Sequence, residues 1–370
     1  MVARDDVWYV NPSPRTWPAS PPRAKDFHAS LPGYAPTPLV DAPELARMLG
    51  VAHVLIKDES ARFDLGAFKI LGTTWAAFQA LAADTGYDGP ADLASLRRHL
   101  APGPARMLVS ATDGNHGRGV ARTARMLGLP AHIFMPAGVP QAAIDRIRGE
   151  GATVVIVDAN YDGAVATANE FAGAATGRLL VQDTGWAGYT DIPNWIAEGY
   201  LTLTNETDDQ VAALGLDGVD VVTAPIGVGA LGQAVIEHFR SDARPHPARV
   251  VAVEPDTAAC VLASLKASTI VTVDTGSTIA NGLNCGTPSA TAWPWMRDGL
   301  SAAVAVSEDD LRQAMKTLAN VGIASGPSGC AAFAGLVAVL TDPERRAELG
   351  VNEHSVVLAP STEGPVPGVE

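Results

Sequence analysis

Short apolar runs, many of them β-branched, alternate along this chain with longer amphipathic segments. The runs predict strands over Val54–Lys57, Met107–Ala111, His132–Met135, Thr153–Val157, Val219–Ala224, Val250–Glu254 and Val356–Ala359. Helical spacing predicts helices over Gly117–Leu127, Gln141–Gly149, Ala164–Thr176, Ile192–Glu206 and Glu308–Val321. Several strands are largely apolar rather than alternating, which is typical of parallel strands covered on both faces. The pattern favours an open, doubly wound α/β fold whose ligands bind at the carboxyl ends of strands.

Composition narrows the function classes further. The chain has 370 residues, 47% of them hydrophobic and 18% charged, which excludes a disordered chain and suggests about two domains. No apolar run approaches the roughly 18 residues of a membrane span, and the net charge of −14 disfavours nucleic acid. Three cysteines without a CxxC pair, and no signal-like pattern at Met1–Asp6, predict a cytoplasmic protein. About the first 35 residues are rich in proline and predict an irregular arm.

A lysine before a predicted helix is the first candidate for chemistry. Lys69 lies between Phe68 and Ile70. Apolar neighbours predict partial burial of the ammonium group, which lowers the pKa of a lysine and leaves the amine able to react with a carbonyl group. By itself, the pattern is more often that of a surface lysine at the start of a helix.

The segment Thr112–Gly117 joins a predicted strand to a helix. Its glycines let the backbone approach a ligand, and the N–H groups at the helix N-terminus can bind a carboxylate. Asn115 can hydrogen-bond an oxygen atom, and Asp113 can hold or move a proton. The alternative interpretation is a glycine-rich turn with Asp113 as helix cap.

A second glycine-rich turn, Gly227–Gly232, follows another apolar run. Such turns bind phosphate on their backbone N–H groups. The spacing Gly-x-Gly-x-x-Gly, with Glu254 after the next strand, also fits the dinucleotide site of a dehydrogenase. That alternative leaves Lys69 and the Asn115 loop without a role.

Taken together, the order of these segments resembles that of fold-type II pyridoxal-phosphate enzymes and, within them, the diaminopropionate ammonia-lyases. The motifs that carry the resemblance are Pro36–Leu39, Lys57–Ser60, Ala67–Lys69, Thr112–Gly119, Gln182–Thr184, Glu254–Asp256, Gly282–Gly286, Gly326–Gly329 and Ser361–Gly364. The aspartate at 113 is the specific element, since serine and threonine dehydratases usually carry Ser or Ala there.

The resemblance implies two open, twisted, mostly parallel sheets with helices on both faces, and pyridoxal 5′-phosphate as the cofactor. It implies a discontinuous division, with residues 1–71 and 207–370 in a larger cofactor domain and 72–206 in a smaller domain. The implied cofactor contacts are Lys69, which binds it covalently, Phe68, Asn115 at the ring oxygen, Gly227, Val228, Gly229, Ala230 and Leu231 at the phosphate, and Ser361 or Thr362 at the pyridine nitrogen.

The implied reaction is elimination of ammonia from 2,3-diaminopropionate, or from a related β-substituted amino acid, giving pyruvate and ammonia through aminoacrylate. Lys69 would act as base on the L enantiomer and Asp113 on the D enantiomer, while Asp183 would attract the β-ammonium group. The substrate contacts would be Thr112, Asp113, His116, Asp183 and Tyr189. The resemblance also implies a homodimer, and the sequence shows no metal-ligand spacing.

Three stretches depart from the family pattern: Gly185–Gly188, Asn281 and Gly364–Val366. They lie near the presumed substrate side and leave a β-replacement synthase open as an alternative. A non-catalytic relative with a binding role is a second alternative, against which the intact Lys69 argues.

Overall fold

The computed structural model describes residues 7–366 and residue 368, so the residues read for a secretory signal lie outside it. The chain divides into two compact units. Unit 1 comprises Met1–Pro22, Pro36–Phe68 and Leu203–Glu370, and unit 2 comprises Arg23–Ala35 and Lys69–Thr202. The family resemblance implied domain boundaries after residues 71 and 206. The two compact units divide after residues 68 and 202.

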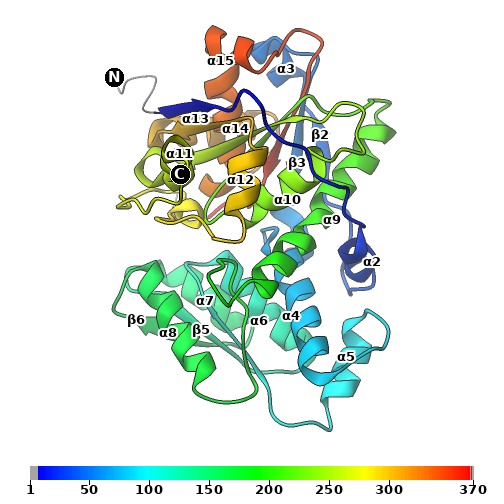
Figure 1. The fold of residues 1–370 in the computed structure, drawn as a ribbon, viewed down its shortest axis with the longest axis vertical. Coiled ribbons are helices and arrows are strands. Elements are labelled where there is room, and N and C mark those ends of the chain that lie inside the picture. Colours follow the sequence, from blue (N-terminus) through cyan, green and yellow to red (C-terminus); the bar gives the residue numbers. More distant parts are fainter. Residues whose placement is uncertain (1–6, 367, 369–370) are drawn as a thin grey trace. The chain divides into compact units, whose positions relative to one another are not determined.

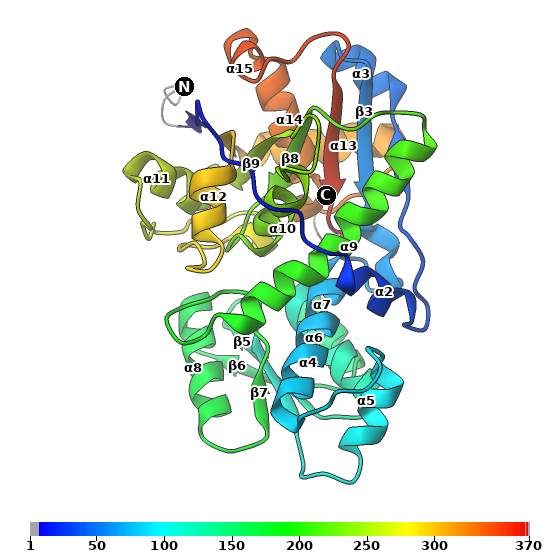
Figure 2. The same cartoon turned by 45° about the vertical axis from the view of Figure 1, so that its right-hand side comes forward.

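Unit 1 is built on a seven-stranded sheet in the order β1-β10-β9-β8-β11-β3-β2. Its strands are β1 (Trp8–Val10), β2 (Leu39–Asp41), β3 (His53–Asp58), β8 (Val221–Pro225), β9 (Arg249–Pro255), β10 (Ala302–Val306) and β11 (Val356–Ser361). The edge strands β1 and β2 run antiparallel to their neighbours, and the other pairs are parallel. Figure 2 shows β11 and β3 side by side, although the two strands come from opposite ends of the chain.

The helices of unit 1 are α3 (Pro43–Leu49), α10 (Ala230–Phe239), α11 (Cys260–Ala267), α12 (Trp293–Gly299), α13 (Glu308–Asn320), α14 (Pro327–Leu340) and α15 (Pro343–Glu348) (Figure 1). Helix α14 is buried along most of its length and belongs to the main apolar core. Gly335 brings it close to β9, since a Cβ atom there would lie 2.2 Å from Val253. Such a helix covers strands that are apolar on both faces, as the sequence pattern predicted.

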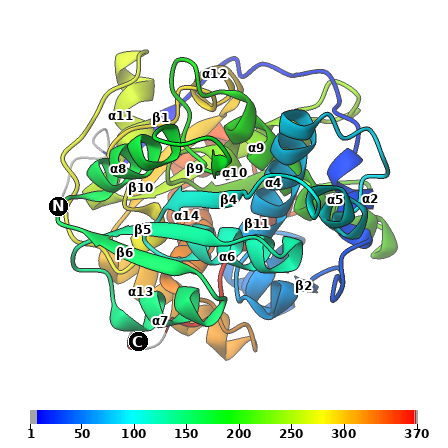
Figure 3. The same ribbon diagram turned by 90° about the horizontal axis from the view of Figure 1, so that it is seen from below.

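Unit 2 carries a four-stranded parallel sheet in the order β6-β5-β4-β7. The strands are β4 (Met107–Ala111), β5 (Ala131–Pro136), β6 (Thr153–Val157) and β7 (Arg178–Leu180). Its helices are α2 (Arg23–Ala29), α4 (Lys69–Thr85), α5 (Leu93–Leu100), α6 (Asn115–Leu127), α7 (Gln141–Gly149), α8 (Tyr161–Gly173) and the first half of α9 (Asp191–Ala213), whose second half belongs to unit 1. Figure 3 shows α8 on one side of the strands and α6 with α7 on the other.

The predicted strands and helices are all present, with most ends displaced by a few residues, but α9 continues past the predicted end at Glu206 to Ala213. The prediction that the N-terminal segment is an irregular arm is wrong in part. Trp8 is buried in β1, which pairs with β10, and Phe27 is buried in α2 against Trp75 and Phe78, with ring centroids 5.2 and 5.0 Å away. These aromatic contacts order a segment whose local composition predicts no element. Within the described residues, no helix is long and apolar enough to cross a membrane.

Candidate active site

A lysine and an aspartate meet at one end of unit 2. Lys69 is the first residue of α4, and Asp183 follows β7. The Lys69 Nζ atom donates to Asp183 Oδ2 over 2.7 Å. The aspartate side chain is 4% exposed and the lysine side chain 20% exposed, so the pair is largely shielded from water while the amine can still be reached. Residues 114 positions apart thus form one reactive pair.

Charge, rather than burial, decides the protonation of this pair. Burial alone would lower the pKa of Lys69, but the Asp183 carboxylate, with Tyr200 and Asp113, raises that pKa above its usual range. Burial alone would raise the pKa of Asp183, but His116 and Lys69 hold it well below its ordinary value. The predicted lowering of the lysine pKa is therefore wrong for the free amine, because the aspartate was not known to lie beside it.

His116 completes the cluster from the first turn of α6. Its Nε2 atom lies 2.9 Å from the carbonyl oxygen of Val181. Its Nδ1 atom lies 3.5 Å from Asp183 Oδ2 and makes no hydrogen bond. Burial lowers the pKa of His116, and the positive charge of Lys69 acts in the same direction. Burial and Lys69 thus favour the neutral imidazole, whereas the Asp183 carboxylate favours the charged one.

The loop before His116 is shaped by Thr112. The Thr112 Oγ1 atom accepts hydrogen bonds from the N–H groups of Gly114 and Gly117, at 2.9 and 3.1 Å. A Cβ atom at Gly117 would lie 2.3 Å from the Thr112 methyl group, so only glycine fits there. The threonine hydroxyl therefore holds the loop, and Asp113 and Asn115 remain half-buried at its surface.

Gln182 fixes the strand ends that carry Asp183. Its Oε1 atom accepts from the N–H of Ala111 over 2.9 Å, and its Nε2 atom donates to the Tyr161 hydroxyl over 2.9 Å. The Tyr189 hydroxyl donates to Leu180 O and accepts from the Gln182 N–H, each over 2.9 Å. Tyr189 thus ties this loop together, and its predicted contact with substrate stays a prediction.

Tyr200 is a neighbour of the lysine that the motifs did not reveal. It is fully buried in α9, and a Cβ atom at Gly72 of α4 would lie 2.6 Å from its ring. A Cβ atom at Gly199 would lie 2.6 Å from Leu71 O. Two glycines therefore let the helices cross closely and bring the phenol beside Lys69, where burial raises the pKa of Tyr200. The signal in the sequence that could have revealed this neighbour is the pair of glycines, Gly72 and Gly199, in segments expected to be helical.

In unit 1, a buried ion cluster supports the segment that leads to Lys69. The Lys57 Nζ atom donates to Thr37 O over 2.7 Å and to Glu206 Oε2 over 2.8 Å. Arg62 donates to both oxygens of Glu59 and both of Glu206, each over 2.8 Å. All four charged side chains are at most 1% exposed. The two cations and two anions balance, which is the condition for burying them.

The predicted terminal loop pairs with the same segment. The N–H of Phe68 donates to Thr362 O over 3.2 Å, and the N–H of Gly364 donates to Gly66 O over 2.9 Å. The Ser361 hydroxyl donates to the Ser325 hydroxyl over 2.8 Å. Both predicted candidates for the pyridine nitrogen, Ser361 and Thr362, are buried, so neither is favoured by exposure.

The glycine-rich turn Gly227–Gly232 lies between β8 and α10, as predicted. Gly229 has φ +110°, which favours glycine, and caps α10 without a side-chain hydrogen bond. A Cβ atom at Gly229 would lie 2.7 Å from the Met296 methyl group, and the Ser289 N–H donates to Val228 O over 2.8 Å. The turn thus presents a helix N-terminus whose first N–H groups are not capped by a side chain, an arrangement that binds phosphate.

Comparison with known proteins agrees with this geometry. The model of the pyridoxal-phosphate dependent enzyme family matches residues 30–361. The diaminopropionate ammonia-lyase of Escherichia coli K12 is 38% identical over 352 residues, which cover 92% of this chain and 87% of that enzyme. The chain belongs to the pyridoxal-phosphate-dependent enzymes. The fold-type II expectation is confirmed, and pyridoxal phosphate is the cofactor.

Two solved structures of Escherichia coli diaminopropionate ammonia-lyase are similar over almost the whole chain. The complex with D-serine has a TM-score of 0.87 at 35% identity and covers 96% of this chain and 93% of its own. The complex with an aminoacrylate–PLP azomethine reaction intermediate has a TM-score of 0.85 at 34% identity, with the same coverage. The likeness extends through both compact units.

Each unit contains residues that suit one part of pyridoxal phosphate. Pyridoxal phosphate needs backbone donors for its phosphate, and the N-terminus of α10 offers them without a competing side-chain cap. Its aldehyde needs a reachable amine, and Lys69 is partly exposed. The individual contacts expected of Phe68, Asn115, Gly227–Leu231, Ser361 and Thr362 stay predictions.

The dehydrogenase alternative fails at its acidic residue. Glu254 is 1% exposed, and its two carboxylate oxygens accept from the N–H groups of Val261 and Leu262, each over 2.8 Å. Burial raises the pKa of Glu254 to about 7. A carboxylate that is buried and turned onto the N-terminus of α11 in this way is not presented to a ribose.

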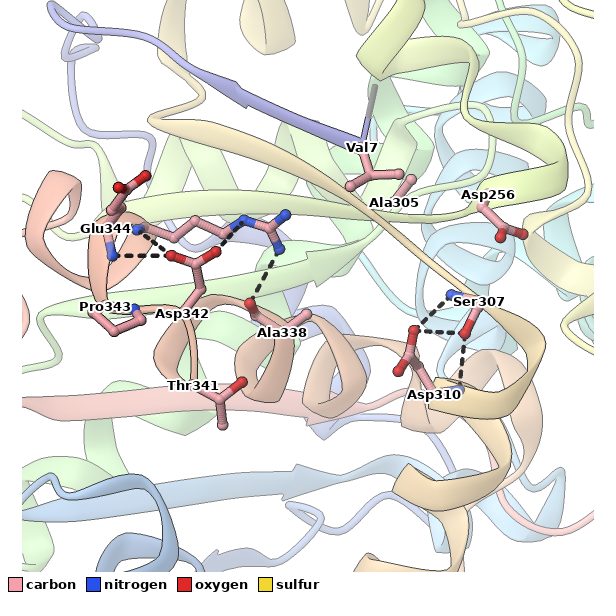
Figure 4. Close-up of a pocket in the computed structure, with 11 residues that line it drawn as sticks. Val7, Asp256, Ala305, Ser307, Asp310, Ala338, Thr341, Asp342, Pro343 and Glu344 are labelled. Carbon is pink, nitrogen blue, oxygen red and sulfur yellow. Dashed lines mark hydrogen bonds and ion pairs between the residues drawn. The ribbon is translucent and has the colours of Figure 1, made fainter. Parts of the chain in front are cut away.

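Unit 1 also contains an open cavity of about 760 Å³. Its lining includes Asp256, Asp310, Asp342 and Glu344 (Figure 4). Asp342 caps α15 by accepting from Glu344 N–H over 2.9 Å, and Asp310 pairs with Ser307 in the cap of α13. These two aspartates therefore serve helix ends, and none of the predicted site residues lines this cavity.

Proposed function

We propose that this chain catalyses the elimination of ammonia from 2,3-diaminopropionate. The observation that carries the proposal is the buried Asp183 carboxylate 2.7 Å from the Lys69 amine, in a family member similar to diaminopropionate ammonia-lyases. A carboxylate at this position suits a substrate with a second ammonium group. A substrate that carries a neutral hydroxyl group, such as serine, needs no such counter-charge.

Three residues of unit 2 have a part in this reaction. When bound, pyridoxal phosphate accepts the electron pair released at the α-carbon. Lys69, or Asp113 for the opposite enantiomer, takes the α-proton, while Asp183 holds the β-nitrogen. The Cβ–N bond breaks and ammonia leaves. Water then converts aminoacrylate to pyruvate and a second ammonia, which balances the reaction.

The remaining assignments belong to the same proposal. Thr112 shapes the loop whose N–H groups would receive the substrate carboxylate, and Tyr189 holds the opposite loop. We further propose a cytoplasmic homodimer, supported by the family resemblance and by the three cysteines, none of which is in a disulfide bond. Sedimentation of the purified protein at twice the chain mass of 38.2 kDa would support the dimer, and sedimentation at one chain mass would contradict it.

The test is an assay of the purified protein with both enantiomers of diaminopropionate. Pyruvate and ammonia should appear in a ratio of about 1 to 2 without a second substrate, as the stoichiometry requires. The Lys69→Ala variant should form neither product, and it should lose the absorbance band of the covalent link between lysine and cofactor. Pyruvate release only after addition of a nucleophilic second substrate would instead identify a β-replacement synthase. Cofactor binding without turnover of any β-substituted alanine would identify a binding protein.

A further inference from the structure

We propose that unit 2 carries a binding site for a phosphate-type dianion on the side of α6 that meets α7, formed by Arg118, Arg122, Arg125 and Arg146. The proposal goes beyond the proposed function and does not depend on it, because it concerns neither the lysine–aspartate pair nor the amino-acid substrate. The sequence motifs assign none of these arginines a role.

Three of the four arginines lie on one face of α6. Arg118, Arg122 and Arg125 are spaced by four and three residues, which places their side chains one above another on a helix. All three reach the carboxylate of Glu150, the C-terminal cap of α7. Arg122 donates to both carboxylate oxygens, over 2.6 and 2.9 Å. The Arg118 Nε and Arg125 Nη1 atoms lie 3.4 and 3.1 Å from one of these oxygens each, so three guanidinium groups gather at one point.

The burial of Glu150 does not by itself explain so many cations. Its side chain is 5% exposed, and a buried carboxylate needs a cation beside it. The two hydrogen bonds from Arg122 already supply a bidentate partner. Burial lowers the pKa of Arg118, and the nearby charge of Arg146, on α7, lowers it further. The cluster therefore contains more positive charge than Glu150 requires.

The size of this excess indicates the charge of the ligand. Arg125 and Arg146 lie in the last turns of α6 and α7, and each helix C-terminus carries about half a negative charge. Together with Glu150, the two helix ends supply about two negative charges against the four arginines. Asp145, a neighbouring carboxylate on α7, is exposed and accepts from the side chain of Gln141 over 2.8 Å. A ligand with two negative charges would balance the remainder.

The guanidinium groups also suit the shape of such a ligand and can be reached by it. Guanidinium groups bind phosphate oxygens through pairs of N–H groups. The side chains of Arg118 and Arg122 are 19% and 20% exposed, and that of Arg125 is 51% exposed, so a small anion has access from solvent. The net charge of −14 disfavours a nucleic acid as the source of the phosphate. The ligand is therefore inorganic phosphate or the phosphate group of a small molecule.

The first experiment measures phosphate binding by the cofactor-loaded protein, in which the phosphate position expected at α10 is already filled. Isothermal titration calorimetry at constant ionic strength in chloride should show saturable binding of inorganic phosphate and of sulfate, another tetrahedral dianion, but not of nitrate, a monoanion. The affinity should fall at least about tenfold in Arg125→Gln/Arg146→Gln, because charge-assisted hydrogen bonds are lost. Absence of saturable phosphate binding, or equal binding by the double variant, would overturn the proposal.

Matched variants separate a lost site from a lost fold. Arg148→Gln removes an exposed arginine from the same last turn of α7, two positions from Arg146 and thus on a different side of the helix, and should bind phosphate like the wild type. Arg125→Glu reverses the charge at an exposed position and should abolish binding while the circular dichroism spectrum stays unchanged. An equal loss of affinity in Arg148→Gln would show a general charge effect and would contradict the proposal.

A further titration distinguishes the two sources of phosphate. Tighter binding of a nucleoside monophosphate than of inorganic phosphate would support the site and identify phosphate esters as its ligands. The reverse order would support the site and identify the free ion. None of these measurements uses turnover, so a failure of the proposed function and a failure of this proposal can be told apart.

Discussion

At the scale of single residues, Asp183 is the group that sets the charge of the site. It pairs with Lys69 at 2.7 Å and faces His116 at 3.5 Å, and the side chain is almost completely buried. A buried carboxylate stays ionised only when cations surround it. A substrate that brings its own ammonium group can take the place of the lysine ammonium in this arrangement.

Replacing Asp183 should therefore change specificity as well as rate. In Asp183→Asn, kcat/KM for diaminopropionate should fall by about 10²-fold or more, in the range of a lost acid–base group. Residual turnover of serine should be affected much less, because its hydroxyl group carries no charge. The measurement is pyruvate release from both substrates at several concentrations. An equal loss for the two substrates would show that Asp183 has no part in recognising the β-ammonium group.

Asp113 allows a test of stereochemistry. Asp113→Asn should abolish turnover of D-diaminopropionate while sparing part of the turnover of the L form, because Lys69 would remain as the base on the other face. Parallel pyruvate assays with the separate enantiomers measure this. Thr112→Ser, which keeps the hydroxyl that holds the same loop, is the control. Equal retention of both activities would refute the assignment of Asp113.

At the scale of elements, the approach to Lys69 depends on the buried ion cluster of Lys57, Glu59, Arg62 and Glu206. Arg62 lies in the short 3₁₀ segment Glu59–Asp64, in which Phe63 and Asp64 both have positive φ. Such backbone strain persists only where surrounding contacts hold it. The cluster provides those contacts and thereby sets the conformation of the chain just before α4.

Breaking one partner of this cluster should destabilise the fold strongly. Arg62→Met leaves two carboxylates without one of their two cations, so the free energy of unfolding should fall by about 3–5 kcal/mol. Urea denaturation followed by circular dichroism measures the loss. Arg47→Met, which removes an exposed partner of Glu44, should cost less than about 1 kcal/mol. A similarly small effect at Arg62 would mean that the cluster adds little to stability.

The crossing of α4 and α9 gives a second prediction at this scale. A methyl group in Gly199→Ala would lie 2.6 Å from the Leu71 carbonyl oxygen, so the helices must separate, at a cost of about 1–3 kcal/mol. Gly173→Ala, at the exposed end of α8 with nothing within 4 Å, should be neutral or slightly stabilising. Chemical denaturation compares the two variants. Equal stability would show that the crossing tolerates wider spacing.

At the scale of the whole molecule, cofactor binding should stabilise the folded chain. A ligand that binds only the native state adds about 2.7 kcal/mol at one hundred times its dissociation constant, so the Tm should rise with pyridoxal phosphate concentration. The gain should be smaller in Lys69→Ala, which keeps the uncapped α10 N-terminus but lacks the amine. Calorimetric scans at graded cofactor concentrations test this, and an identical gain in the variant would contradict covalent binding at Lys69.

The sequence by itself determined the elements and the loops that follow them. Apolar runs such as Val356–Ala359 and glycine-rich turns such as Gly227–Gly232 are local signals, because period, propensity and turn chemistry act over a few residues. Because these signals are local, elements whose own residues carry only a weak pattern were not predicted. The alanine-rich β10 and the three-residue β7 carry weak patterns, and α2 is ordered by aromatic side chains more than forty residues further along the chain.

Only the tertiary structure decided the electrostatics. The sequence named Lys69, His116 and Asp183 separately, but the sign of the lysine pKa shift depends on a carboxylate 114 residues away. The environment of Lys57 and Arg62, and the place of Tyr200 beside α4, likewise follow from close packing. Coulomb energies depend on distance and burial rather than on position in the chain, so folding had to bring these charges together before their chemistry was defined.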